Sequence, residues 1–346
     1  MKNLIKNPSL ACVQLLSLIM LGCAPAEPEK LAGSTMGTYY QVTTRTNECV
    51  DYAEAIEQRL AQLNQSLSTY IPDSELSLIN QTPAGEVIHL NKELEQVLQT
   101  AEIVWRQTDG AFDVTIGPLV NLWGFGPDQA QARTTPPDDQ QQAARQRIGM
   151  SLLDLAGAQL IKQHAETYID LSALAKGFAV DELAQILLEQ GCANFMVDIG
   201  GEILAVGFNP QGQPWRLGIE TPSAEQVGQV HTVIALSDLA IATSGDYRNF
   251  RMVDGEAIDH VLDPRTGRPG TSQVVSATVL HPSAMLADAY ATALMVLGED
   301  EGMALAEELG LAVYLIMRSE APGATRPWRL RYTRSMAELL PESGLQ

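Results

Sequence analysis

The chain has 346 residues, of which 45% are hydrophobic and 18% are charged. This length and composition suit a globular protein with one large domain or two lobes, and they exclude a chain that is disordered throughout. With 22 basic and 42 acidic residues the formal net charge is −20, which repels phosphate backbones, so no nucleic acid is expected as a partner. A phosphorylated ligand would need a local site made of a cation, backbone N–H groups or a few basic side chains.

Residues 1–22 are predicted to be a signal peptide. Lys2 and Lys6 precede an apolar run at 10–21. This run is shorter than a transmembrane helix, which needs about 20 apolar residues. The run ends in a small residue followed by Cys23 and a polar, proline-containing stretch. This pattern resembles a bacterial lipoprotein signal and predicts attachment of lipid to Cys23. The alternative is an ordinary secretory signal in which Cys23 is incidental.

The remaining cysteines give no sign of a metal site. Cys12 leaves with the signal peptide, and Cys49 and Cys192 belong to no CxxC pair or zinc motif. Their spacing leaves open whether they form a disulfide, and small buried side chains are the favoured interpretation. A structural zinc site is therefore excluded.

The mature chain is predicted to begin with a tether at 23–33 and to continue as a folded domain at 34–346, which could contain two lobes. A β-rich run at 34–43, interrupted by a glycine, predicts a strand. Apolar residues at helical spacing predict helices at 51–67 and 91–108.

The second half begins with a segment at 124–144 that is rich in Pro, Gln and Asp and predicts a surface excursion leading into a helix. Further helices are predicted at 173–190, 284–297 and 299–309, and strands at 195–199, 202–206, 215–219, 231–236, 240–243, 274–280 and 311–318. Because the strands cluster instead of alternating strictly with helices, we expect an α+β fold with mixed or antiparallel strands packed against helices.

The predicted helix at 284–297 carries a candidate metal site. Asp288 and Thr292 are four residues apart, so on a helix they lie on one face, one turn from each other. A carboxylate and a hydroxyl are hard oxygen ligands that suit Mg²⁺ or Ca²⁺. Alanines around them would let another backbone approach and add a carbonyl ligand. The alternative is a capping or solvated Asp288 and a Thr292 bonded to its own helix.

A candidate anion site precedes the predicted helix at 173–190. Asp170 or Ser172 could cap this helix, which places Lys176 in its early turns. A cation there opposes the helix dipole, but the placement becomes favourable if a phosphate binds at the same N-terminus. The alternative is a solvated surface lysine.

His260 is the best candidate for a general base among five histidines. It is close in sequence to Asp259 and Asp263, and neighbouring carboxylates raise the pKa of a histidine towards the working range of a base. Adjacent residues of a strand face opposite ways, so Asp259 need not contact it. Ser244 lies in Thr-Ser-Gly-Asp, which lacks the GxSxG pattern of a serine hydrolase.

Glycine-flanked turns at 109–119 and 197–202 would allow a ligand to approach the backbone closely. Neither segment matches a Rossmann or P-loop fingerprint. The ligand class therefore does not follow from these turns alone.

Taken together and in this order, these segments resemble the ApbE family of FAD:protein FMN transferases, from Ser34 to about Gly310. Eight motifs in register carry the resemblance: Thr35-Met36-Gly37-Thr38, Ser68-Thr69-Tyr70 with Asp73-Ser74-Glu75, Asp109-Gly110-Ala111-Phe112-Asp113, the segment from Asp170 to Asp181, Asp198-Ile199-Gly200-Gly201, Thr243-Ser244-Gly245-Asp246-Tyr247, His260-Val261-Leu262-Asp263-Pro264, and Ala287-Asp288-Ala289 with Thr292. The resemblance implies an ApbE-like, T-fold-like architecture.

The resemblance also implies an exported enzyme that takes FAD and Mg²⁺, transfers FMN to a threonine of a partner protein through a phosphoester, and releases AMP. Mg²⁺ would be bound by Asp288, Thr292 and a backbone carbonyl, with Ala173 expected to provide it and Ser172 and Ala175 as alternatives. The residues implied to bind FAD are Met36, Tyr70, Ala111, Phe112, Asp113, Asp170 and Lys176. His260 would help to deprotonate the acceptor threonine, and Lys176 would meet the phosphates.

The implied acceptors are subunits of membrane redox complexes, at the periplasmic side of a bacterial membrane to which the protein itself is held by its lipid anchor. Two other functions stay open. One is an FAD pyrophosphatase that uses water as the acceptor and gives FMN and AMP, and the other is a lipoprotein that binds FAD without chemistry.

Overall fold

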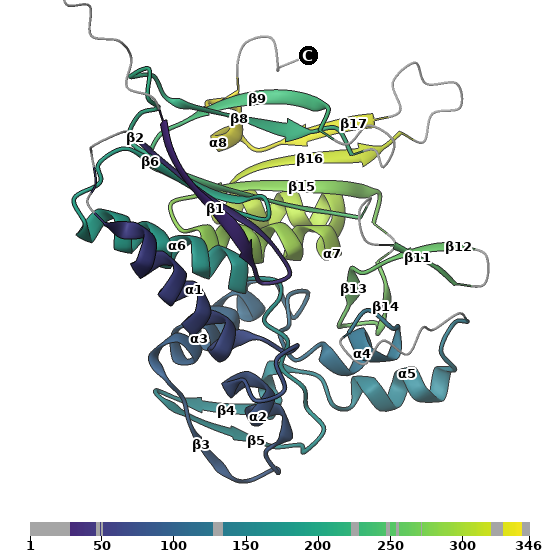
Figure 1. Cartoon of the computed structure of the whole chain (residues 1–346). Coiled ribbons are helices and arrows are strands. Elements are labelled where there is room, and N and C mark those ends of the chain that lie inside the picture. Colours follow the sequence, from purple (N-terminus) through teal and green to yellow (C-terminus); the bar gives the residue numbers. More distant parts are fainter. Residues whose placement is uncertain are drawn as a thin grey trace, which may run out of the picture.

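A large antiparallel sheet forms the centre of the computed structural model (Figure 1). The structure describes residues 28–45, 49, 51–126, 134–222, 228–246, 250–253, 256–270, 272–319 and 328–340. The predicted signal peptide and Cys23 lie outside these residues. Among the described helices, none combines the length and hydropathy that a membrane span requires.

Eight described strands pair in the order β1-β2-β6-β7-β10-β15-β16-β17, and every pair is antiparallel. Their bounds are β1 Pro28–Thr35, β2 Thr38–Arg45, β6 Phe195–Ile199, β7 Glu202–Val206, β10 Leu239–Gly245, β15 Val274–His281, β16 Ala312–Arg318 and β17 Trp328–Tyr332. β1 with β2 and β6 with β7 are hairpins, whereas β15 and β16 are joined through the long helix Ala284–Glu308. The α+β fold that the clustered strands predicted is confirmed.

The N-terminal strand differs from the prediction. β1 begins at Pro28, inside the predicted tether, and the single strand expected at 34–43 is a hairpin of β1 and β2. Met36 and Gly37 form its two-residue turn, with φ angles of 47° and 72°. Positive φ at both central residues matches the twist of the paired strands, so Gly37 reverses the chain instead of merely interrupting a strand.

Each face of the sheet carries its own apolar layer because successive residues of a strand point to opposite faces. In β16, Val313, Leu315 and Met317 pack with the helical layer, whereas Tyr314 and Ile316 pack on the other side. Three helices form most of the first layer: α1 (Tyr52–Leu67), α6 (Ala175–Glu189) and α7 (Ala284–Glu308). The opposite face carries the hairpin of β8 (Trp215–Glu220) and β9 (Val230–Leu236), together with α8 (Arg334–Ala337) (Figure 1).

The long helix α7 contains a break at Gly298, whose φ of 75° and ψ of −165° are not helical. This is the position at which the sequence separated two predicted helices, so the prediction is confirmed. α7 is apolar on all sides, and most of its residues before the break are buried, as expected of a helix enclosed between a sheet and other helices.

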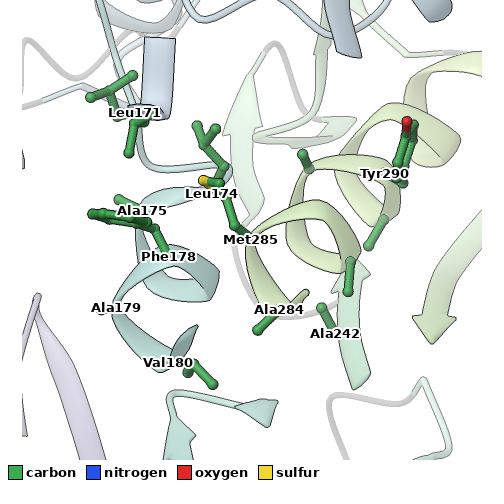
Figure 2. Packing of buried hydrophobic residues seen from close by; sticks show 14 of the residues in the cluster. Leu171, Leu174, Ala175, Phe178, Ala179, Val180, Ala242, Ala284, Met285 and Tyr290 are labelled. Atoms are coloured by element: carbon green, nitrogen blue, oxygen red, sulfur yellow. The ribbon is translucent and has the colours of Figure 1, made fainter. Parts of the chain in front are cut away.

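Helices α6 and α7 pack closely where they cross, with Met285 directed towards Leu174 and Phe178 nearby (Figure 2). Gly177 makes this approach possible. A Cβ atom at Gly177 would lie 2.3 Å from the carbonyl oxygen of Ala284, which leaves no room for a side chain.

Each of these helices is capped by an aspartate of the other. The Asp288 carboxylate of α7 accepts a hydrogen bond from the Gly177 N–H in the first turn of α6, at 3.1 Å. Asp181 of α6 accepts bonds from the N–H groups of Ala284 and Met285, at 2.7 and 3.0 Å. A carboxylate at a helix N-terminus satisfies unpaired N–H groups and favours the dipole, so the two helices fix each other's position.

The cap expected from Asp170 or Ser172 is wrong. Leu174 holds the cap position of α6 without a side-chain bond, and Asp170 accepts from the N–H of Ser172 at 2.9 Å. The sequence suggested a local cap because an Asp and a Ser precede the helix. A more distant aspartate takes that role after folding.

A second group of elements lies below the helical layer in Figure 1. It contains α2 (Glu75–Gln81), α3 (Lys92–Gln107), and a three-stranded sheet of β3 (Val87–His89), β5 (Gln159–Lys162) and β4 (Leu153–Ala156). To one side are the helices α4 (Gly117–Leu122) and α5 (Asp138–Arg145), and the short hairpins of β11 (Phe250–Val253) with β12 (Glu256–Asp259) and of β13 (Leu262–Asp263) with β14 (Arg268–Pro269) (Figure 1). A 3₁₀ turn (Met150–Leu152) precedes β4. Of the predicted excursion at 124–144, residues 127–133 lie outside the described chain and α5 occupies its end.

Cys49 and Cys192 form a disulfide, with a Cα–Cα distance of 5.0 Å. The bond joins the segment before α1 to the segment after α6, across a sequence separation of 143 residues. Cys192 is buried as expected, but the interpretation of both cysteines as unpaired small residues is wrong. Sequence spacing could not show the pairing, because the tertiary fold alone brings these two segments together.

Candidate active site

A cavity of about 1060 Å³ opens where the helical layer, the central sheet and the lower elements meet. This volume is at the upper end of the about 300–1,000 Å³ found for ligand sites and suits a large ligand. Ten site residues expected from the sequence line it: Tyr70, Ala111, Phe112, Asp113, Asp170, Ala173, Lys176, His260, Asp288 and Thr292. Segments from across the chain therefore converge on one site.

Asp288 and Thr292 both line the cavity from α7, as their four-residue spacing predicted. The hydroxyl of Thr292 lies 3.2 Å from the hydroxyl of Ser244 on β10, which orients it. Asp288 is only 3% exposed, and burial raises the pKa of its carboxyl against the opposing effects of Lys176 and the Gly177 N–H. Asp288 also caps α6, so the capping role given as the alternative is present alongside its place in the cavity.

Lys176 lies between two buried carboxylates. Its Nζ is 3.6 Å from Oδ2 of Asp288 and 3.5 Å from Oε1 of Glu202. Burial alone would lower the pKa of Lys176, but the two carboxylates more than offset this and raise it, so the ammonium stays protonated. Lys176 is therefore paired within the site and is not the solvated surface lysine given as the alternative.

Glu202 is the main site residue to which the sequence assigned no role. It is 5% exposed, and burial together with the charge of Asp288 raises its pKa, against the opposing effect of Lys176. Its Oε2 atom is buried and has no hydrogen-bond partner among the described residues. Burying such an oxygen is unfavourable for the folded state unless a ligand donates a hydrogen bond to it or a cation binds it.

The position of Glu202 follows from a tight turn. Gly200 and Gly201 connect β6 to β7 with φ angles of 65° and 106°, and Ile199 pairs with Glu202 across the turn. The N–H of Gly201 donates to Asp198 at 3.0 Å. The sequence signal was an acid directly after a Gly-Gly turn, but it was interpreted only as a place of close backbone approach.

The residues present fit a hard divalent cation. Asp288, Thr292 and Ala173 line the same cavity and offer a carboxylate, a hydroxyl and a backbone carbonyl as candidate ligands. The described residues contain no cluster of three or more His, Cys, Asp or Glu side chains arranged around one metal position. A cation here would therefore combine one carboxylate with neutral oxygens, in a region where two carboxylates face one ammonium.

Asp113 lines the cavity but uses its carboxylate to hold a loop. It accepts bonds from the N–H and hydroxyl of Thr115, at 2.8 and 2.5 Å, and from the N–H of Met150 at 3.3 Å. Burial raises the pKa of this carboxyl, and these donors oppose the shift. Asp113 therefore shapes the wall formed by Ala111 and Phe112.

Two tyrosines stand at the cavity and are unusually exposed for aromatic side chains. Tyr70 is 67% and Tyr39 is 51% exposed, and both line the cavity. Met36 does not line it; it lies in a separate open depression formed by residues 34–39. Tyr39 was missed because the hairpin turn at Met36-Gly37, which sets the direction of β2, was not predicted.

His260 lines the cavity beside Phe125, with ring centroids 6.5 Å apart. The carboxylate of Asp263, which was expected to lie near it, accepts hydrogen bonds from the N–H and guanidinium of Arg265. Burial raises the pKa of the nearby acid Asp246, and its ion pair with Arg318 opposes this shift more than the charge of His260 does. The side chain of Asp259 lies outside the described structure.

Comparison with known proteins bears directly on this cavity. The model of the ApbE family matches residues 36–315, which include every residue lining it. The chain belongs to the ApbE family. The family expected from the eight motifs is thereby confirmed.

Two ApbE relatives carry the name FAD:protein FMN transferase. One, from Vibrio cholerae, is 44% identical over 314 residues, covering 89% of this chain and 93% of the relative. The other, from Haemophilus influenzae, is 42% identical over 303 residues, covering 84% of this chain and 86% of the relative.

Solved ApbE structures share the fold. The flavin transferase ApbE from Vibrio cholerae aligns with a TM-score of 0.83 and 42% identity, covering 91% of this chain and all of that one. The apo form of the Pseudomonas stutzeri flavinyl transferase ApbE aligns with a TM-score of 0.82 and 34% identity, covering 91% of this chain and 97% of that one. The expected ApbE-like architecture is confirmed.

Proposed function

We propose that the chain transfers FMN from FAD to a threonine side chain of a partner protein, with Mg²⁺, and releases AMP. Flavin transfer to a protein is the activity after which its ApbE relatives are named. The observation that carries the finer proposal is the convergence of Asp288, Thr292, Lys176 and His260 on one cavity large enough for a dinucleotide.

A net charge of −20 repels a diphosphate, so a diphosphate site in this protein needs local positive charge. Lys176 supplies a fixed positive charge at the wall, and Asp288 and Thr292 with the Ala173 carbonyl would hold Mg²⁺. When bound, Mg²⁺ supplies charge neutralisation at the diphosphate, which is the main requirement of phosphoryl transfer.

Other wall residues would position FAD and its acceptor. Tyr70 provides an exposed aromatic face, Ala111 and Phe112 provide an apolar wall, and Asp170 adds a polar edge. His260 lies on the cavity wall where an incoming hydroxyl could reach it, and a histidine is the usual side chain for taking a proton from an alcohol. Transfer to threonine joins the acceptor oxygen to the FMN phosphorus, breaks the diphosphate bond and leaves AMP.

We further propose that the protein acts at the periplasmic side of a bacterial membrane, held there by lipid on Cys23, on subunits of membrane redox complexes. The disulfide between Cys49 and Cys192 supports an exported location because disulfides persist mainly in oxidising compartments. The lipoprotein-like signal supports the anchor.

The test is an assay of AMP and flavin products with the wild type and Asp288→Ala. With FAD, Mg²⁺ and a threonine-containing acceptor, the wild type should release AMP and add the mass of FMN to the acceptor. Asp288→Ala should lose AMP release by at least about 100-fold, because the carboxylate ligand is gone. Turnover that persists in chelator would refute the metal assignment.

The same assay separates the alternative functions. AMP and free FMN formed without an acceptor would identify an FAD pyrophosphatase. Retention of FAD with no AMP would identify a flavin-binding protein without chemistry.

A further inference from the structure

Glu202 carries the strongest unexplained feature of the molecule. Its Oε1 contacts Lys176, while its Oε2 is buried and has no hydrogen-bond partner among the described residues. The side chain is 5% exposed and lines the cavity. A buried carboxylate with half its hydrogen-bonding capacity unused is unfavourable, so its retention at this wall needs a reason.

The arrangement around Lys176 supplies that reason. The ammonium lies at nearly equal distances from Asp288 and Glu202, 3.6 and 3.5 Å. Asp288 is also the carboxylate that the proposed function assigns to the divalent cation. Lys176 and the cation are therefore competitors for one carboxylate, because two positive charges at the same oxygen pair repel each other.

Glu202 offers the ammonium a second position. When Asp288 is taken by a cation, Lys176 can stay in the buried wall only if another carboxylate neutralises it, and Glu202 is already in contact. Its free Oε2 can accept the hydrogen bonds that Lys176 no longer gives to Asp288. The lysine then remains at the cavity instead of blocking the metal or leaving the site.

We propose that Glu202 is a positioning residue that holds Lys176 when a divalent cation occupies Asp288, and so relieves their competition. This inference rests on the cation site of the proposed function. It goes beyond that function because it assigns a role to Glu202 and predicts that Lys176 opposes cation binding when Glu202 is absent.

The test is a double-mutant cycle of Glu202→Gln and Lys176→Met, with the affinity for Mn²⁺ measured by calorimetry and electron paramagnetic resonance on the protein without FAD. Glu202→Gln alone should weaken Mn²⁺ binding by about tenfold or more, since Lys176 then stays on Asp288. In the Lys176→Met background the same change should weaken Mn²⁺ binding by less than about threefold, because no ammonium is left to compete for Asp288.

Two further variants control for charge and folding. Glu220→Gln removes a carboxylate from the same cavity wall and should have equal effects in both backgrounds. Glu202→Asp keeps the charge and should retain part of the affinity. Circular dichroism and thermal unfolding establish that each variant is folded before its affinity is compared.

Turnover gives an independent signature. For Glu202→Gln the Mg²⁺ concentration at half-maximal rate should rise about tenfold, and kcat should also fall because excess Mg²⁺ then displaces Lys176 from Asp288 with no second carboxylate to hold it. A half-maximal Mg²⁺ concentration equal to that of the wild type would overturn the positioning role.

The outcomes distinguish the two levels of inference. Equal losses from Glu202→Gln in both backgrounds would show that Glu202 acts on the cation independently of Lys176 and would overturn only this proposal. A wild-type protein that binds no Mn²⁺ would overturn the cation site of the proposed function and the competition together.

Discussion

Asp288 illustrates how one side chain serves both the fold and the site. Its carboxylate accepts the Gly177 N–H, pairs with Lys176 and lines the cavity. Replacing it therefore removes a helix cap as well as a candidate metal ligand. His260 is a cleaner probe of chemistry because it lies at the cavity wall, outside the packed helical layer.

His260→Ala should reduce the rate of FMN transfer by about 10²–10⁴-fold, because the acceptor hydroxyl loses its base. FAD affinity, measured by fluorescence quenching, should change by less than about threefold. Parallel losses of FAD binding and transfer would count against the role of His260 as a base.

At the scale of elements, the α6–α7 pair determines the geometry of the site. Lys176 is on α6, Asp288 and Thr292 are on α7, and their relative positions depend on the crossing point and the mutual caps. The close contact at Gly177 is the part of this arrangement that a single added methyl group can test.

Gly177→Ala should destabilise the protein by about 2 kcal/mol, because overpacking at the Ala284 carbonyl outweighs the helix propensity of alanine. Gly302→Ala in α7 is the matched control, since its added methyl would meet only the end of the flexible Leu294 side chain. Urea unfolding should place the control within about 1 kcal/mol of the wild type. Stabilisation by Gly177→Ala would contradict the close crossing.

A second link between helices is expected to depend on pH. Arg59 of α1 binds Glu93 of α3 at 2.8 Å and Glu182 of α6 at 2.5 Å. Burial alone would raise the pKa of Glu93, but the hydrogen bond and charge of Arg59 reverse this and hold it below 4.5. A lowered carboxyl pKa stabilises the fold above 4.5, and this stabilisation is lost as the pH falls through the folded-state value.

Arg59→Met should therefore lower the free energy of unfolding by about 2 kcal/mol near neutral pH, and the difference from the wild type should shrink at about pH 3. Urea unfolding at both pH values measures this. Arg106→Met, which removes an exposed pair with Glu102 on one helix, should have no measurable effect at either pH. A pH-independent loss for Arg59→Met would mean that packing of its stem is responsible.

At the scale of the whole molecule, the central sheet lies between the helices α1, α6 and α7 and the β8–β9 hairpin (Figure 1). The sheet separates two apolar layers, and residues of the helical side line the cavity. The disulfide between Cys49 and Cys192 ties the start of α1 to the strand β6, which leads into the Gly-Gly turn before Glu202. It thus cross-links the helical layer to the sheet and closes a loop of 143 residues in sequence.

Removal of this cross-link by the double change Cys49→Ala and Cys192→Ala should reduce the free energy of unfolding by about 3–5 kcal/mol, because the unfolded chain regains the freedom of a long loop. Dithiothreitol should produce a similar loss in the wild type and none in the double variant. Equal sensitivity of both proteins to the reductant would contradict the assignment.

The sequence by itself predicted the fold class, most helices and strands, and the face of α7 that carries Asp288 and Thr292. These features depend on local periodicity, on glycine turns and on the four-residue repeat of a helix, so neighbouring residues suffice to reveal them. Ordered motifs were also enough to predict the family. Short elements such as β3, β4 and β11 were not predicted because a few residues carry too little periodicity.

Only the tertiary structure decided which partners the chemical groups find. It paired Cys49 with Cys192, gave the cap of α6 to Asp288 and placed Glu202 beside Lys176. Each of these contacts joins residues from separate elements and depends on how helices cross and strands pair. Composition and spacing contain no record of those distances, so the charge balance at the cavity wall emerges only when the chain is folded.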